Sequence, residues 1–343
     1  MPQGPAENRV FYYTAPKQMA VKRQPCPSPG PGEIRCRSIC SLVSIGTEMI
    51  CYGREVEEGS VWDAWIQYPF EPGYSSVGEV VDCGEGVESP APGDIVCSTS
   101  SHRAWFIDRP DNVHPVPAGV SLEEAAWFCL DIIVQNGIRE TRPEMGETAV
   151  VIGLGPLGQL AVRLLGLCGL ENLVAVDPLA SRCDLARTHG PTEIICSPAD
   201  KAVARVRELT DGRGADIVFD ITGHPAAFHA AQHMLRRRGR LGLVGDVPRP
   251  GLQTLTHDVV SNSISIVGAR GACPPWRGND YYRWGKRELT GFFFRMIAGG
   301  RIKLGDLTTH RIAPEKAPEV YAEIYANRSA FMGVIVDWAG REK

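Results

Sequence analysis

Apolar and polar residues follow a regular order in the middle of the chain. Short apolar runs such as Val150-Val151-Ile152 are typical of buried strands, and each is followed by a stretch whose apolar residues have helical spacing. Such alternation predicts a parallel sheet with helices on both faces. The predicted strands are 149–152, 173–176, 193–195, 217–220 and 240–244, and the predicted helices are 159–167, 181–188, 202–209 and 226–235.

The pattern before position 120 is different. Residues 9–120 contain short apolar segments interrupted by Pro and Gly, for example at 33–39, 78–83 and 94–97. Their spacing and alternation predict an antiparallel, barrel-like β domain.

A helix is predicted at 122–139, with Ser121 as its N-cap. Later elements are a helix near 288–298, a helix at 317–326 and a strand at 333–336, and this tail is expected to return to the first domain. The sequence thus predicts an α/β protein in which residues 1–120, completed by 285–343, form one domain and residues 121–284 form the other.

Composition excludes several classes of protein. The 343 residues are 43% hydrophobic and 22% charged, with a net charge of −4, which gives no electrostatic reason to expect nucleic acid or an anionic membrane as a partner. No apolar run reaches the ~18–20 residues that span a bilayer. The first residues have neither a basic region nor an apolar run, so no signal peptide is expected and the cytoplasm is the predicted location. The 11 cysteines include no Cys-x-x-Cys pair, so most are expected to be reduced and buried.

The first chemical motif follows the strand at 149–152. Gly153-Leu154-Gly155-Pro156-Leu157-Gly158 matches Gly-x-Gly-x-x-Gly and leads directly into a helix, and the next strand ends in Asp177, 24 residues after Gly153. In a dinucleotide-binding βαβ unit, the glycines allow the tight turn, the approach of a pyrophosphate and the close packing of the helix. The N-terminus of the helix supplies N–H groups for the phosphates. The motif therefore predicts a nucleotide cofactor.

Asp177 favours NAD over NADP. A carboxylate at the end of the second strand accepts hydrogen bonds from the ribose hydroxyls and repels a 2′-phosphate. Arg182, five residues later, could stack on adenine or weaken that repulsion. The alternative is that Asp177 only caps the turn before Pro178.

The chain resembles the medium-chain dehydrogenase/reductase superfamily over nearly its whole length. The matching segments are Ile45-Gly46-Thr47-Glu48, Pro72-Gly73-Tyr74-Ser75-Ser76-Val77-Gly78-Glu79-Val80, Gly93-Asp94-Ile95-Val96, the nucleotide motif, Asp220-Ile221-Thr222-Gly223 and Gly239-Arg240-Leu241-Gly242-Leu243-Val244-Gly245. The resemblance implies a Rossmann doubly wound parallel-sheet domain and a GroES-like β-barrel catalytic domain. It also implies that Thr222 and Gly245 contact the cofactor.

The sequence departs from the zinc enzymes of that superfamily at their metal ligands. Ile45 and Tyr74 stand where those enzymes have cysteine and histidine, and Ser75 stands where they have glutamate. Isoleucine cannot bind a metal, tyrosine is a poor zinc ligand, and Cys129, the third ligand position, cannot hold a metal alone. The four-cysteine structural lobe is also missing. The chain therefore resembles a zinc-independent branch, and no metal is expected.

Alcohol oxidation without a metal needs a proton acceptor and hydrogen-bond donors for the developing alkoxide. Thr47 has the family position of a proton-relay hydroxyl. Tyr74 would point a phenol at the reacting oxygen, but its pKa near ~10 would have to fall for it to act as a base. Asp131 lies in an otherwise apolar run, where a raised pKa would suit an acid/base role. Alternatively, Tyr74 only fills the volume of the lost zinc, and Asp131 faces solvent or pairs with Arg139.

The expected substrate pocket contains Glu48, Trp62, Trp65 and Trp276. Aromatic faces stack on sugar rings or bury apolar substrates, although the later cluster around Trp276 fits a subunit interface as well. Glu48 is expected to be a structural acid paired with an arginine. By family resemblance, the last Rossmann strand at 263–267 pairs with its copy in a homodimer, since an unpaired apolar edge is a liability.

Three functions remain open at this point. The first is an NAD-dependent, zinc-independent dehydrogenase that acts on a secondary alcohol of a small molecule such as a sugar or cyclitol. The second is a quinone- or enoyl-type reductase, which Asp177 disfavours because such enzymes usually prefer NADPH. The third is a non-catalytic nucleotide-binding homologue.

Overall fold

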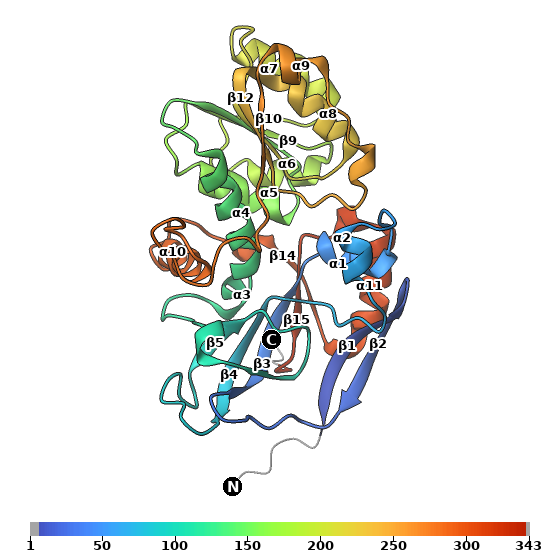
Figure 1. The fold of residues 1–343 in the computed structure, drawn as a ribbon, viewed down its shortest axis with the longest axis vertical. Coiled ribbons are helices and arrows are strands. Elements are labelled where there is room, and N and C mark those ends of the chain that lie inside the picture. Colours follow the sequence, from blue (N-terminus) through green and yellow to red (C-terminus); the bar gives the residue numbers. More distant parts are fainter. Residues whose placement is uncertain (1–6, 341–343) are drawn as a thin grey trace. The chain divides into compact units, whose positions relative to one another are not determined.

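The computed structural model describes residues 7–340 (Figure 1). The chain forms two compact units, one of residues 1–129 and 276–343 and the other of residues 130–275. These boundaries compare with the sequence-based ones at 120/121 and 284/285. Within the described residues, no helix is long and apolar enough to cross a membrane.

Unit 2, residues 130–275, is built on a parallel sheet that has six strands in the described residues. The strand order is β10-β9-β8-β11-β12-β13, which is the order of a doubly wound dinucleotide-binding sheet. The strands are β8 (Thr148–Ile152), β9 (Asn172–Val176), β10 (Glu193–Ile195), β11 (Ala215–Asp220), β12 (Leu235–Leu243) and β13 (Ser265–Gly268).

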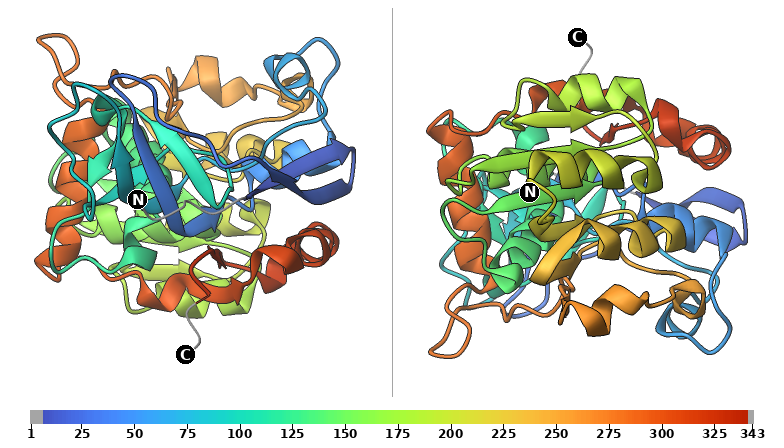
Figure 2. Two further views of the ribbon diagram at one scale, coloured as in Figure 1. Left: turned by 90° about the horizontal axis from the view of Figure 1, so that it is seen from below. Right: turned by 90° about the horizontal axis from the view of Figure 1, so that it is seen from above.

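Helices connect consecutive strands of this sheet. Because the order runs outward from β8 in both directions, right-handed connections place helices on both faces (Figure 2). The sheet is buried, as every residue of β8 is less than a tenth exposed. The helices are α5 (Pro156–Leu165), α6 (Ala180–Ala186), α7 (Ala199–Leu209), α8 (Pro225–Met234) and the short α9 (His257–Ser261).

Unit 1 has a mostly antiparallel sheet whose central strand is β3 (Ile34–Val43). One edge of β3 is shared, because β6 pairs with its first half and β15 with its second half, while β4 pairs along the other edge. The remaining order is β14-β15 on one side and β4-β5-β7 on the other. The strands are β4 (Ser76–Cys83), β5 (Ile95–Ser98), β6 (Trp105–Asp108), β7 (His114–Pro115), β14 (Thr308–Ile312) and β15 (Gly333–Asp337).

A separate hairpin and several helices complete unit 1. Strands β1 (Asn8–Ala15) and β2 (Gln18–Gln24) pair with each other, and helix α11 (Ala317–Ala326) packs against β2 (Figure 1). Side chains from the hairpin, α11 and β15 share one apolar core. Residues 276–343 thus belong to the same unit as residues 1–129. The other helices are α1 (Thr47–Gly53), α2 (Val61–Trp65), α3 (Leu122–Ala125) and α10 (Lys286–Ala298).

The predicted helix at 122–139 is two helices. Ser121 is the N-cap of α3, as predicted, since its side chain accepts the Glu124 N–H, but α3 ends at Ala125 and α4 (Phe128–Thr141) begins three residues later. The Ala126 carbonyl oxygen accepts a hydrogen bond from the Ser75 hydroxyl at 2.6 Å. This tertiary bond uses an acceptor that a continuous helix would need for its own ladder.

Candidate active site

The glycine-rich loop follows β8 at the carboxyl end of the sheet in unit 2. Gly153 has a φ of +93°, which favours glycine, and a Cβ atom on Gly158 would lie 1.8 Å from the Gly153 carbonyl oxygen. Gly155 is the N-cap of α5, with Pro156 at the first helical position. A Cβ atom on Gly155 would meet nothing closer than Arg182 Nη1 at 3.8 Å. The loop therefore packs tightly on itself but leaves room for a phosphate group at Gly155.

Asp177 ties this loop to the end of β9. Its carboxylate accepts the Leu154 N–H at 2.7 Å and the Leu179 N–H at 2.9 Å, and the side chain is nearly buried. The guanidinium of Arg182 lies 3.7 Å from the same carboxylate. Asp177 thus caps the turn, as the alternative interpretation held, and Arg182 lies where it would weaken repulsion of an added phosphate.

Two further loops reach the carboxyl end of the same sheet after β11 and β12. Strands β8 and β11 are adjacent, and connections leave them in opposite directions, which is the switch point where ligands bind in open α/β sheets. The Thr222 methyl group lies next to Gly153, and a Cβ atom on Gly245 would lie 2.4 Å from the Ile221 carbonyl oxygen. The predicted cofactor residues of these loops therefore lie at one end of one sheet.

Asp220, the last residue of β11, was not among the predicted site residues. One carboxylate oxygen accepts hydrogen bonds from the Thr222 N–H and hydroxyl and the Gly223 N–H, whereas the other is buried without a partner in the described part of the chain. Burial raises its pKa. The signal was an aspartate that ends an apolar strand, the same signal that identified Asp177.

The predicted catalytic residues of unit 1 form a group of hydroxyls. Thr47 begins α1, and Tyr74 precedes β4. The Tyr74 hydroxyl donates to Ser44 Oγ at 2.6 Å and lies 3.4 Å from Thr47 Oγ1. Burial raises the pKa of Tyr74, so its environment opposes the role of a base and suits a hydrogen-bond donor. Ser44 was missed because a serine in an apolar segment gives no signal in the sequence.

Glu48 does not line a pocket, contrary to the sequence-based expectation. Its side chain is buried and accepts hydrogen bonds from the Ser44 N–H at 2.8 Å and the Tyr321 hydroxyl at 2.6 Å. His102 Nε2 lies 3.2 Å from both carboxylate oxygens. The partners of this structural acid are therefore a histidine and a tyrosine, and the expectation of an arginine was wrong.

Asp131 lies on α4 and belongs to unit 2. Its side chain has no exposed surface, which excludes the alternative that it faces solvent. Gln135 Nε2 donates to Oδ2 at 2.6 Å, and Arg139 donates to Gln135 Oε1 at 3.2 Å, so Arg139 reaches Asp131 through an amide. Oδ1 is buried without a partner within the described residues. Burial raises the pKa of Asp131 well above its usual value, which favours a neutral carboxyl at neutral pH.

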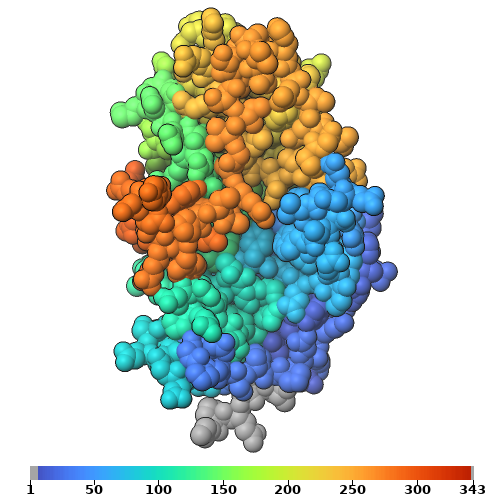
Figure 3. Space-filling view, viewed as in Figure 1, coloured from blue at the N-terminus to red at the C-terminus, as the bar shows by residue number. Residues whose placement is uncertain are grey.

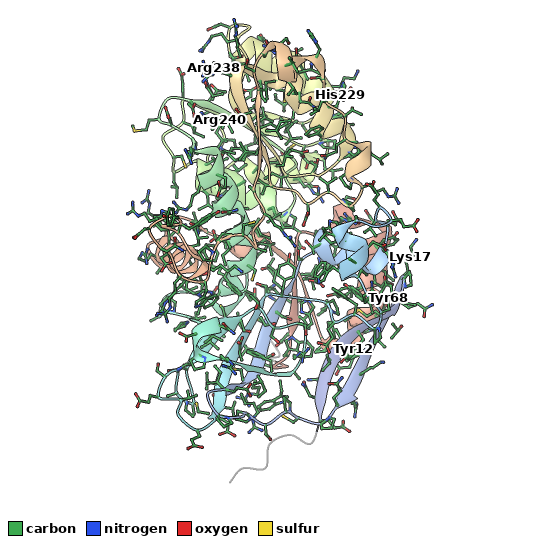
Figure 4. The ribbon with its side chains drawn as sticks, in the orientation of Figure 1. Tyr12, Lys17, Tyr68, His229, Arg238 and Arg240 are labelled. Carbon is green, nitrogen blue, oxygen red and sulfur yellow. The ribbon has the colours of Figure 1, made fainter. Side chains whose placement is uncertain are left out.

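The three tryptophans predicted for the substrate pocket have different neighbours within the described residues. Trp62 is buried and its ring centroid lies 5.6 Å from that of Trp65, which is half exposed. Trp276 packs elsewhere in unit 1, with its ring centroid 4.5 Å from that of His114. Tyr68, labelled in Figure 4, packs against the apolar core that contains Trp62, and its hydroxyl donates to the Cys51 carbonyl oxygen at 2.8 Å.

The residues of unit 1 do not fit a catalytic zinc ion. Next to Tyr74, the Cys129 thiol donates to the Tyr74 carbonyl oxygen at 2.9 Å, and burial raises its pKa to about 12. A cysteine binds zinc as a thiolate, which the Tyr74 carbonyl oxygen does not favour because it accepts a hydrogen bond from the protonated thiol. Among residues 7–340, no group of three or more His, Cys, Asp or Glu side chains is placed to hold a metal ion.

Comparisons with known proteins agree with this fold. A family model described as zinc-binding dehydrogenase matches residues 156–282. D-guloside 3-dehydrogenase of Escherichia coli (strain K12) is 28% identical over 77% of this chain and 77% of its own. L-threonine 3-dehydrogenase of Bacillus licheniformis is 25% identical over 83% of this chain and 84% of its own.

Solved structures match nearly the whole chain. A protein of Sinorhizobium meliloti 1021 described as a zinc-binding dehydrogenase, with NADP bound, has a TM-score of 0.80 at 16% identity and covers 97% of this chain and 100% of its own. A protein of E. coli CFT073 described as a short chain alcohol dehydrogenase, in complex with NADH, has a TM-score of 0.77 at 17% identity and covers 97% of this chain and 100% of its own. The Rossmann sheet and the unit formed from both ends of the chain are thus shared with these dehydrogenases, and the similarities agree with the resemblance of the chain to the medium-chain dehydrogenase/reductase superfamily.

Proposed function

We propose that the chain interconverts a secondary alcohol and a ketone with NAD(H) and without a metal ion, on a sugar, a cyclitol or a related polyhydroxylated metabolite. The relatives support the coarser part, a dehydrogenase that acts on the alcohol group of a small molecule with a nicotinamide cofactor. The observation that carries the finer part is the Ser44–Tyr74–Thr47 hydroxyl group, which stands where a metal centre would need thiolate and imidazole ligands.

The residues that would hold the cofactor lie at the carboxyl end of the sheet of unit 2. When bound, a nicotinamide accepts or donates a hydride. Asp177 supports NAD, because its carboxylate disfavours a 2′-phosphate, although Arg182 at 3.7 Å weakens that effect. The residues proposed to contact the cofactor are Gly153, Leu154, Gly155, Pro156, Leu157, Gly158, Asp177, Arg182, Thr222 and Gly245.

The proton chemistry is assigned to three side chains. Tyr74 has one O–H, which would turn from Ser44 Oγ to the reacting oxygen and so stabilise an alkoxide, while the Ser44 hydroxyl would donate to the phenol oxygen; the raised pKa of Tyr74 suits this donor role. Thr47 passes the proton of the substrate hydroxyl, since a threonine hydroxyl is too weakly acidic to keep a charge. Asp131, whose pKa is raised, is the candidate for acid/base exchange: its protonated carboxyl would give a proton to the alkoxide when the ketone is reduced, and its ionised form would accept the hydroxyl proton when the alcohol is oxidised.

A homodimer in the cytoplasm completes the proposal. Strand β13 is the edge of the sheet in unit 2, and Ser265 and Ile266 are exposed there. Pairing of two such edges would satisfy their backbone groups. The free thiols of the described cysteines are consistent with a reducing compartment.

The test is NAD-dependent oxidation by chelator-treated protein over a panel of sugars, cyclitols and simple secondary alcohols, followed by NADH absorbance. We expect oxidation of a ring polyol that survives metal removal. Loss of activity on chelation would overturn the metal-free proposal. If no substrate of the panel is oxidised although NADH still binds, the result would favour a quinone- or enoyl-type reductase or a non-catalytic homologue.

Variants test whether the hydroxyl of Tyr74 takes part in the reaction or whether its ring only fills space. Tyr74→Phe removes the donor to Ser44 and is expected to lower kcat about tenfold or more, in line with the loss of one alkoxide donor. Tyr68→Phe is the matched control, because that phenol donates only to a backbone carbonyl of unit 1. Equal kcat values in the two variants would remove Tyr74 from the reaction.

A further inference from the structure

A hollow of about 530 Å3 lies along one face of α10 in unit 1, apart from the hydroxyl group around Tyr74. We call it the α10 pocket. Arg287, Gly291, Phe294 and Arg295 line it at helical spacing, and β7 and the loop before α10 supply the rest of the wall. This segment, orange in Figure 3, lies at the surface of the molecule.

The α10 pocket is strongly positive. Arg283, Arg287 and Arg295 line it and are exposed, and none of them pairs with a carboxylate in the described part of the chain. Its one acidic lining residue, Glu288, already accepts the Gly278 N–H at 2.7 Å. Three guanidinium groups without counter-charges provide many donors in the planar geometry that suits phosphate and carboxylate oxygens.

Buried polar atoms without partners gather at the same wall. His114 and Thr290 line the α10 pocket and are at most 4% exposed, yet His114 Nε2 and Thr290 Oγ1 have no hydrogen-bond partner within residues 7–340. Trp276, whose ring packs on His114, has an unpartnered Nε1 as well. Unsatisfied buried polar atoms are costly, and native proteins keep few of them without a ligand or water. The wall is thus polar where an apolar packing surface would be expected.

His114 is also held neutral. Burial and the charges of Arg287 and Lys286 lower the pKa of its imidazole to about 3. A neutral ring offers one donor and one acceptor, so it can bind a hydroxyl group of a ligand whose charge is bound by the arginines.

We propose that the α10 pocket is a binding site for a small organic phosphate, separate from the nucleotide loop. The arginines would bind the phosphate group, and the faces of Trp284 and Phe294 would contact the organic part. The volume exceeds that of inorganic phosphate alone, which is why an organic ester is the favoured class. The inference uses residues of unit 1 only and does not depend on the proposed dehydrogenase activity.

The test is calorimetric titration of the full chain with glucose 6-phosphate at low salt, compared with glucose and with inorganic phosphate. We expect binding of glucose 6-phosphate, weaker binding of inorganic phosphate and none of glucose. The Arg287→Gln/Arg295→Gln double variant should bind at least 30-fold more weakly, because two charge-assisted contacts are lost. Arg277→Gln is the matched control, since Arg277 lies on the same loop but pairs with Asp111 at 2.7 Å.

Thermal unfolding of each variant checks that it is folded. An unchanged Kd in a folded double variant would place the phosphate elsewhere, for instance at the glycine-rich loop, and would overturn the proposal. So would equal affinity for glucose and glucose 6-phosphate, or no heat of binding at millimolar ligand. Thr290→Val gives an independent check, with an expected threefold or greater loss of affinity if its hydroxyl contacts the ligand.

Discussion

Asp177 and Asp131 are both buried aspartates of unit 2, but their surroundings differ. Asp177 ends a strand and receives two backbone N–H groups, with a guanidinium 3.7 Å away. Asp131 lies in the first turn of helix α4, and its carboxyl receives one side-chain amide, from Gln135. The comparison teaches that two buried aspartates of one unit differ in the donors they receive: backbone N–H groups bind the Asp177 carboxylate, whereas Asp131 has one amide donor and burial raises its pKa.

The largest effect is expected from a substitution that distorts the glycine-rich loop to which Asp177 is hydrogen-bonded. Gly158→Ala places a methyl group 1.8 Å from the Gly153 carbonyl oxygen, so the glycine-rich loop must move. We expect NADH affinity to fall by more than 100-fold in a fluorescence titration. Gly268→Ala is the control, because a Cβ atom there meets nothing within 4 Å. Normal affinity in Gly158→Ala would show that the loop is not the cofactor site.

Asp131→Asn tests the other acid. If the carboxyl exchanges the proton, turnover should fall by about 100-fold, the usual size of a general acid/base contribution. The expected stability change depends on pH. Above about pH 3.8 the unfolded carboxyl ionises while the folded one stays protonated, so wild-type stability falls with rising pH by at most about 1.4 kcal/mol per unit.

The Asn variant lacks this slope. The free energy of unfolding of the variant minus that of the wild type should therefore increase as pH rises from 4, until the folded carboxyl ionises. Denaturant titrations at several pH values measure this difference. Turnover within threefold of wild type would exclude Asp131 from acid/base chemistry. A constant stability difference over that range would show that its pKa is not raised.

Asp177→Ala removes the acceptor from two N–H groups. We expect a loss of about 2 kcal/mol in the free energy of unfolding and a tenfold rise in the ratio of NADPH to NADH affinity, because the 2′-phosphate no longer meets a carboxylate. Asp184→Ala, an exposed aspartate of α6, is the control. An unchanged affinity ratio would mean that Asp177 acts only as a cap.

The smallest effect is expected from Gln135→Leu. Leucine is of similar size but cannot donate to Asp131, so the carboxyl loses its amide donor. A neutral carboxyl depends little on that donor, and the expected loss is about 1 kcal/mol in denaturant unfolding. A loss above 3 kcal/mol would indicate that Asp131 is ionised in the folded protein.

Much of unit 2 was predictable because its signals are local. The strand at 193–195 was predicted with the bounds of β10, and the glycine-rich loop lies between β8 and α5 as expected. Prediction from local sequence failed where the structure depends on a contact with a residue far away in the chain. At the helix break, the Ala126 carbonyl oxygen accepts from Ser75, 51 residues away, and the partners of Glu48 include His102, 54 residues away. No spacing rule connects such pairs, because tertiary packing alone brings them together.

Strand β15 gives unit 1 a late step in its assembly. It pairs with β3 along Cys40–Val43, so this part of the central strand gains its partner only when residues 333–337 have been synthesised. During synthesis the continuous segment 130–275 can complete its sheet first, while the second half of one β3 edge stays open until β15 leaves the ribosome. In this interval that apolar half-edge is the part of the nascent protein that most needs protection from other chains.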